Sequence, residues 1–237
     1  SLIRSIISGH GSEGEFTNGI FYNIETFNSG MEWNIISKEI WRDDCGEVAL
    51  YPQGGAWIYD RANWCPGDKI IINRHDITSS INPGQNNTFR FNLDGSNEDI
   101  DATYDYSFQL INYSSPNFNL DAVMEDIIAP STKQEHFRFN PSCSNPIVKI
   151  KNQGSQTLTS VEIVYGFEGY TQNTYSWSGN LEIGETEEVE LPPINWYSWE
   201  EKVPFYARVE SPNNSIDEYN VNDLLYSDYE FVEEYPS

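Results

Sequence analysis

At 237 residues the chain is long enough for two domains, each with a hydrophobic core of its own. It carries 37 acidic and 13 basic residues, and the resulting net charge of −24 would repel phosphate backbones and anionic lipids. We therefore expect no nucleic-acid partner. We also expect no membrane span, because no apolar run approaches the roughly 20 residues that a span needs.

Aromatic residues make up 14% of the chain and accompany many Asn, Ser and Gly residues. Disordered proteins are poor in aromatic residues, whereas exposed β-structure is rich in them. The composition therefore predicts an all-β protein of an extracytoplasmic compartment, either secreted, periplasmic or on the cell surface.

The first half of the chain shows period-two apolar patterns typical of strands. Residues 1–8 run apolar and stop at Gly9-His10-Gly11, which predicts a strand that ends in a loop. Residues 118–128 indicate a short helix. The other strands predicted in this half cover residues 20–27, 31–36, 69–74, 88–93 and 104–113.

A Pro and Ser break at residues 139–142 predicts the domain boundary, with one domain over residues 1–138 and another over residues 139–237. The spacing of the strands after this break is typical of a β-sandwich. This stretch, about residues 142–233, also resembles the immunoglobulin-like adhesion modules of secreted bacterial proteins in its turns and strands. The strands predicted in it cover residues 147–151, 161–167, 174–177, 187–191, 205–209 and 224–231.

The densest segment is WRDDCGEVALYPQGGAWIYDRANWCPGD, residues 41–68, an irregular stretch of the kind that carries functional sites. Cys45 and Cys65 enclose 19 residues of it. A disulfide closing such a loop would stabilise the fold by about 3 kcal/mol, and the expected oxidising compartment favours it. The alternative is two unpaired buried thiols. Cys143 is the third cysteine and is expected to pair with neither.

Three strings carry a resemblance to a known family: SGHGSEGEF at residues 8–16, DCG at residues 44–46 and DRANWCPGD at residues 60–68. Together they resemble the second domain of the bacterial peptide N-glycosidase F family, amidases that release N-linked glycans from asparagine. The resemblance is strong over about residues 1–72. It implies a jelly-roll fold, a Cys45–Cys65 disulfide, and an upstream jelly roll that contributes the principal catalytic aspartate.

The resemblance also assigns residues to an active site. Glu15 occupies the place of the family's second-domain glutamate, Arg61 that of its active-site arginine and Trp64 that of a substrate-facing tryptophan. His10 stands where the type enzyme has a tryptophan. The cysteines that flank the family's glutamate are absent here, so Glu13 is a rival to Glu15. We thus expect Glu15 and Arg61 to be catalytic, and Trp64, His10 and Glu13 to bind substrate.

Simpler interpretations of these residues remain open. Arg61 is also compatible with a surface pair to Asp60 or Asp43. Trp64 is as compatible with a core position as with stacking on a sugar ring, and Glu13 and Glu15 with two solvated carboxylates.

No metal and no cofactor is expected. The three histidines are isolated in sequence, which disfavours copper. Residues 94–105 offer oxygen ligands, but they lack the Gly and Glu positions of an EF-hand, which favours a solvated acidic turn.

The leading functional hypothesis is the C-terminal part of a secreted amidase acting on the glycosylated asparagine of N-glycoproteins, inactive without its upstream domain. The rival is a non-catalytic protein that binds glycan or glycopeptide, and a third hypothesis is a purely structural adhesion module. Because the family's second jelly roll has strands before the Gly9-His10-Gly11 turn, the first strand must also find partners. We expect it to be paired on both sides, by upstream residues, by a neighbouring chain or by part of residues 73–119.

Overall fold

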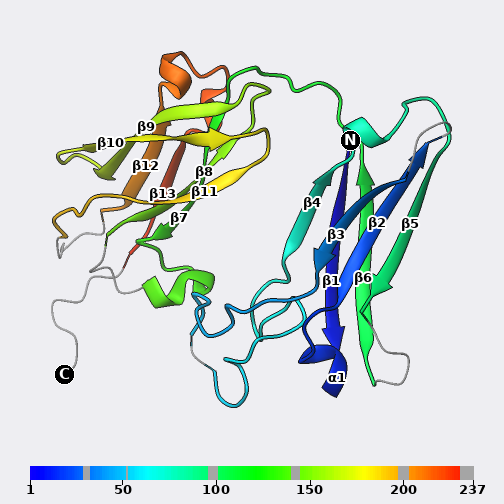
Figure 1. Ribbon diagram of the computed structural model, residues 1–237. Helices are drawn as coiled ribbons and strands as arrows, with labels where there is room; N and C mark the ends of the chain where they lie inside the picture. The colour runs from blue at the N-terminus through cyan, green and yellow to red at the C-terminus, as the bar shows by residue number, and fades with distance from the viewer. Residues whose placement is uncertain (29–32, 52, 96–100, 140–144, 197–202, 230–237) are drawn as a thin grey trace. The chain divides into compact units, whose positions relative to one another are not determined.

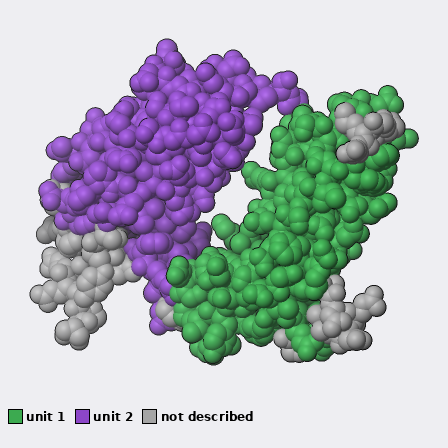
Figure 2. Space-filling model, in the orientation of Figure 1, with its two compact units in different colours: residues 1–48, 52–113 green, residues 49–51, 114–237 purple. Residues whose placement is uncertain are grey.

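The computed structural model describes residues 1–28, 33–51, 53–95, 101–139, 145–196 and 203–229 (Figure 1). Two compact units make up the chain, shown in different colours in Figure 2. The first holds residues 1–48 and 52–113, and the second holds residues 49–51 and 114–237. Both units are built from antiparallel sheets, which confirms the predicted all-β class.

The first unit is a sandwich of two three-stranded sheets, ordered β4-β1-β6 and β3-β2-β5. Its core gathers buried side chains from both sheets, including Ile3 and Ile7 of β1 and Tyr22 and Ile24 of β2. The strands are β1 (Leu2–His10), β2 (Phe21–Asn28), β3 (Asn34–Glu39), β4 (Ile72–Asp76), β5 (Asn87–Asp94) and β6 (Thr103–Ile111).

Strand β1 is the central strand of its sheet, with antiparallel partners on both sides. Ile3 lies opposite His75 of β4 and Leu110 of β6. The prediction that a segment from residues 73–119 folds back beside the first strand is therefore confirmed. Because β1 is fixed on both sides, the turn that follows it starts from a rigid position.

In its described residues the second unit is a sandwich of seven strands, with sheet orders β11-β8-β7 and β10-β9-β12-β13. Its core includes Ile150, Ile163, Trp177 and Phe205, all buried. The strands are β7 (Ala122–Ala129), β8 (Ile147–Asn152), β9 (Leu158–Phe167), β10 (Asn173–Leu181), β11 (Thr186–Glu190), β12 (Phe205–Glu210) and β13 (Leu224–Ser227).

The structure corrects two predictions in the middle of the chain. Residues 122–129 form strand β7 where a short helix was expected, and β7 pairs with β8 of the second unit. The first unit therefore ends at Tyr113, which makes the predicted boundary after residue 138 wrong. Strand β7 is buried along most of its length, so it lacks the period-two alternation that marks a half-buried strand.

Candidate functional site

The candidate site begins at the turn that follows β1. Gly11 has φ 85°, a conformation that favours glycine, and the backbone N–H of Glu15 donates to its carbonyl over 2.9 Å to close the single turn α1 (Ser12–Glu15). The chain is packed tightly here: a Cβ added to Gly9 would lie 2.5 Å from the Gly14 carbonyl oxygen and 2.7 Å from Cβ of Ala62. The glycines of SGHGSEGEF thus bring this turn against residues 61–64.

The segment that carries Arg61 and Trp64 is fastened at both ends. Cys45 and Cys65 form a disulfide with an S–S distance of 2.04 Å, as predicted. At the other end, Arg42 and Arg61 form an antiparallel bridge, with N–O distances of 2.8 and 3.0 Å. The third cysteine, Cys143, lies outside the described residues.

Arg42 is itself a buried anchor. Its guanidinium pairs with Asp44 at 2.5 Å and with Asp68 at 2.6 Å, and donates to the Lys69 carbonyl at 3.2 Å. Burial is the largest single influence on the pKa of Arg42 and lowers it. Hydrogen bonds and charge from the two carboxylates together outweigh burial, so the pKa is raised above its usual value. Arg42 therefore links the two ends of the loop that the disulfide also closes.

Backbone hydrogen bonds join this loop to the turn after β1. The N–H of Gly9 donates to the Ala62 carbonyl at 3.0 Å, and the N–H of Ala62 donates to the Glu15 carbonyl at 2.9 Å. Trp64 donates its indole N–H to the Gly9 carbonyl at 3.0 Å. Asn63, at φ 65°, donates its side-chain amide to the Ile7 carbonyl at 2.6 Å. The turn after β1 and the loop around residues 61–64, distant in sequence, are thus joined by hydrogen bonds.

Where the turn and the loop meet, Arg61 forms an ion pair with Glu15. The Arg61 side chain is 6% exposed and that of Glu15 20% exposed. The guanidinium carbon lies 4.8 Å from the ring centre of Phe16 and 4.9 Å from that of Trp64. Both distances are within the range of cation–π attraction. Arg61 also donates to the Ala56 carbonyl at 2.5 Å. Its partner is thus Glu15, where the simpler interpretation expected Asp60 or Asp43.

Burial lowers the pKa of Arg61 from its usual value. A guanidinium nevertheless remains charged in proteins. Its Nε is buried and has no hydrogen-bond partner among the described residues. The site therefore holds a fixed positive charge in an aromatic setting, balanced by one carboxylate.

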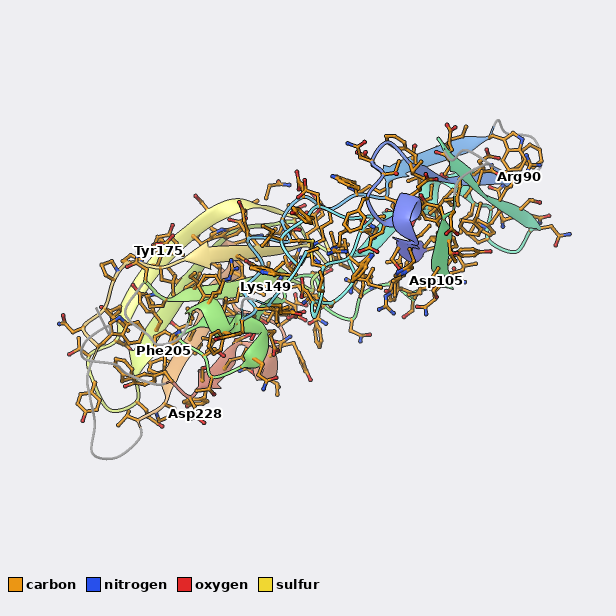
Figure 3. All side chains as sticks on the ribbon, turned by 90° about the horizontal axis from the view of Figure 1, so that it is seen from below. Arg90, Asp105, Lys149, Tyr175, Phe205 and Asp228 are labelled. Atoms are coloured by element: carbon orange, nitrogen blue, oxygen red, sulfur yellow. A yellow bond between two sulfur atoms is a disulfide. The ribbon has the colours of Figure 1, made fainter. Side chains whose placement is uncertain are left out.

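The other predicted site residues lie around this pair. The rings of His10 and Trp64 are 5.5 Å apart. His10 Nε2 lies 2.9 Å from Ser8 Oγ and 3.8 Å from a carboxylate oxygen of Asp105, which is labelled in Figure 3. Trp64 is half-buried.

Glu13 is exposed on α1, and no side-chain hydrogen bond or ion pair to it is found among the described residues. The structure thus groups Glu15, Arg61, Trp64 and His10 and leaves Glu13 at the rim.

Phe16 was not singled out from the sequence, although it ends the string SGHGSEGEF. Its ring faces Arg61, while the residue itself is 45% exposed. A phenylalanine directly after a candidate glutamate, in a Gly-rich string, was the available signal. Asp105 gave no such signal, because its contact with His10 depends on the pairing of β6 with β1.

This arrangement combines a charged donor with flat aromatic rings. A charged donor can stabilise negative charge on an oxygen, and flat aromatic rings can pack against a sugar.

Within the described ranges, no set of three His, Cys, Asp or Glu side chains is arranged to hold a metal ion. None of the helices in these ranges is both long and apolar enough to cross a membrane.

The comparisons agree with the family resemblance. Residues 2–113 match the family described as "Peptide-N-glycosidase F, C terminal". The search of curated proteins found no match. Among solved structures, the chain is similar to a "putative cell surface protein (272-376 domain)" from Methanosarcina acetivorans, determined by solution NMR. That similarity has 18% identity and a TM-score of 0.36, and covers 48% of this chain and 94% of the other.

Proposed function

Because residues 2–113 match the C-terminal domain of peptide N-glycosidase F, we propose that this chain is the C-terminal part of a secreted amidase. The substrate is the glycosylated asparagine side chain of N-glycoproteins. The Cys45–Cys65 disulfide supports a location outside the cytoplasm. The observation that carries the proposal is the Glu15–Arg61 ion pair, whose guanidinium contacts the rings of Phe16 and Trp64.

Each group has a part in this chemistry. Arg61 provides a fixed positive charge for the oxygen that becomes negative when the amide carbonyl is attacked. Glu15 holds Arg61 in place and presents a partly exposed carboxylate to water or substrate. Trp64 and His10 offer neighbouring rings on which a sugar can pack.

Hydrolysis also needs a group that activates water. In the proposed site Glu15 is already paired with Arg61, so an additional carboxylate is required. We propose that an upstream jelly-roll domain supplies it, as the resemblance implies, and that the chain alone is inactive.

The test compares glycan release from a denatured glycopeptide by this chain and by a longer protein that includes the upstream domain. We expect turnover only from the longer protein, and a loss of about 100-fold or more in kcat for E15Q and R61A. The exposed Glu47 gives a matched control, E47Q, expected to leave the rate unchanged. Turnover on the order of 1 per second by the chain alone would contradict the proposal.

A second candidate function is non-catalytic glycan binding. It is favoured by the pairing of Glu15 with Arg61, which occupies the carboxylate, and by the exposed Phe16 beside the half-buried Trp64. Titration of a glycopeptide into W64A separates the two functions when combined with the activity assay. Weakened binding in W64A, together with no glycan release by the longer protein, would favour the binder. W33A is the control, since Trp33 is an exposed tryptophan that contacts Phe27 and Arg90 instead.

A further inference from the structure

The second unit contains a group of acidic side chains at the starts of β7 and β13. Asp121 directly precedes β7 and Asp223 directly precedes β13; the two residues are 3% and 8% exposed. Strand β7 is an edge strand of one sheet and β13 an edge strand of the other, and β7 packs against β13. The two carboxylates therefore lie where the two sheets of the sandwich meet.

Two of the neighbouring acidic residues already have defined partners. Asp217 accepts backbone N–H groups of Ala122 at 2.8 Å and Tyr219 at 2.7 Å. Glu218 accepts the N–H of Asn119 at 2.8 Å. These bonds hold residues 217–219 against the segment before β7. Among the acidic residues of this cluster, Asp223 is the one with a buried oxygen that has no partner among the described residues.

Two buried oxygens in this cluster have no partner within the described part of the chain. They are Oδ1 of Asp223 and Oδ1 of the adjacent Asn222. The amide nitrogen of Asn222 donates to a carboxylate oxygen of Asp121 at 3.0 Å and to Gln153 Oε1 at 3.3 Å, so the Asn222 side chain lies directly beside the Asp121 carboxylate. An unsatisfied buried acceptor costs roughly 1–3 kcal/mol, and each of these is an acceptor beside negative charge. Such a group of oxygens is suited to a cation.

Electrostatics support the same conclusion. Burial and the neighbouring charges of Asp217 and Asp121 raise the pKa of Asp223 to about 7. Burial likewise raises the pKa of Asp121, with Asp217 and Glu218 adding to the effect. The basic groups near the cluster are already engaged: Arg208 pairs with Glu210 at 2.6 Å and Lys151 with Glu125 at 3.3 Å.

We propose that Asp121, Asn222 and Asp223 bind a calcium ion that links the start of β7 to the start of β13. Calcium takes about six to eight oxygen ligands in flexible geometry, so two carboxylates and one amide would supply part of its shell and water the rest. Magnesium, which demands near-octahedral geometry, suits this set less well. The site is distinct from the proposed amidase site, which lies in the first unit.

The test measures binding and thermal unfolding of the full chain after removal of divalent ions with EDTA. We expect isothermal titration with calcium chloride to give one ion per chain. We also expect saturating calcium to raise one thermal transition by about 5 °C, since a ligand that binds only the folded state stabilises it. Potassium chloride of equal ionic strength should not do so. An equal shift with potassium chloride, or no heat of binding, would overturn the proposal.

Variants make the test independent of folding defects. In EDTA, D223N should be at least as stable as the natural protein, because it removes one of the mutually repelling carboxylates; it should also lose the calcium response. D121N should lose the response as well. The matched control is D228N, at an exposed aspartate labelled in Figure 3, which should keep the full response. A calcium response that persists in D223N would refute the site.

The same experiment also tests an arrangement in which Asp223 is satisfied without a metal ion. Arg208 Nε is also buried without a partner, and a turn of its guanidinium onto Asp223 would satisfy both groups without a metal. In that case the natural protein would show no calcium response and R208Q would be destabilised. The proposal instead requires that R208Q retain calcium binding.

Discussion

Glu15 and Arg61 are 46 positions apart in the sequence and form a largely buried ion pair in the structure. Around it, Phe16 and Trp64 lie on the guanidinium, and the backbone of Ala62 donates to that of Glu15. The pair therefore contributes to the packing of the first unit as well as to the proposed chemistry. Its removal should be visible in stability measurements that require no substrate.

Substitution R61A should destabilise the first unit by about 3 kcal/mol, because it leaves the Glu15 carboxylate without its partner. R61K should recover part of this loss, since lysine keeps the charge but cannot reproduce the planar contacts with Phe16 and Trp64. Urea unfolding followed by tryptophan fluorescence gives the free energies. If R61A proves as stable as the natural protein, the ion pair does not form in solution.

Removal of the disulfide should also destabilise the first unit. Cys45 and Cys65 are separated by 20 positions, and the loop-entropy relation gives a loss of about 3 kcal/mol for the C45A/C65A variant. The anchor made by Arg42 with Asp44 and Asp68 remains in that variant, so the loop should keep its local fold. Non-reducing peptide mapping should recover the linked peptides, and free thiols at both positions would contradict the pairing.

Close packing at Gly9 gives a third prediction. An added Cβ would lie 2.5 Å from the Gly14 carbonyl oxygen and 2.8 Å from the Tyr104 ring, and the backbone atom cannot easily move. We expect G9A to lose about 1–3 kcal/mol of stability and to displace Glu15. G54A is the matched control, because nothing lies within 4 Å of a Cβ at Gly54. Equal stability of the two variants would show that the turn is more loosely packed.

Much of the first unit was predictable because its signals are local. The period-two run of residues 1–8 gave β1, and the cysteine spacing in an expected oxidising compartment gave the disulfide. The partner of Arg61 was not predictable from the residues alone. Asp60 is adjacent to Arg61 in sequence and Asp43 lies in the same segment of residues 41–68. The contact with Glu15, in contrast, depends on how two distant segments are joined.

Strand β7 shows a second limit. Its residues AVMEDIIA are buried on both faces except around Glu125 and Asp126, and its pairing with β8 is irregular at two places. A continuous apolar run of this kind does not distinguish a strand from a buried helix. Residues 122–129 form a strand because they pair with the edge of β8, and the sequence pattern does not show this pairing. The domain boundary was misplaced for the same reason.

The final prediction concerns pH, to which the two units should respond in opposite directions. In the first unit, burial and the charge of Lys38 lower the pKa of His75 below 6.5. The neutral ring lies in a partly buried network, with its Nε2 3.1 Å from Ser5 Oγ and 2.9 Å from the Tyr22 hydroxyl. Because the unfolded state binds the proton more readily, this stabilisation is present above about pH 6.5 and is lost as the pH falls below it.

In the second unit the sign is reversed. The pKa of Asp223 is raised from 3.8 to about 7, so the folded state binds the proton more tightly than the unfolded state. Stability from this group is fully present below about pH 4 and is lost as the pH rises to 7, by on the order of 4 kcal/mol. Asp126 titrates at about 2 and so does not contribute in this range.

Calorimetry in EDTA between about pH 4.5 and 7.5 should therefore show two transitions that shift in opposite directions. H75Q should flatten the transition that falls in acid, and D223N the one that falls towards neutral pH. The contrast removes the effect of net charge, since a general repulsion among the acidic residues would destabilise both units together as the pH rises. Parallel shifts of the two transitions, unaffected by either substitution, would show that this general repulsion outweighs both buried groups.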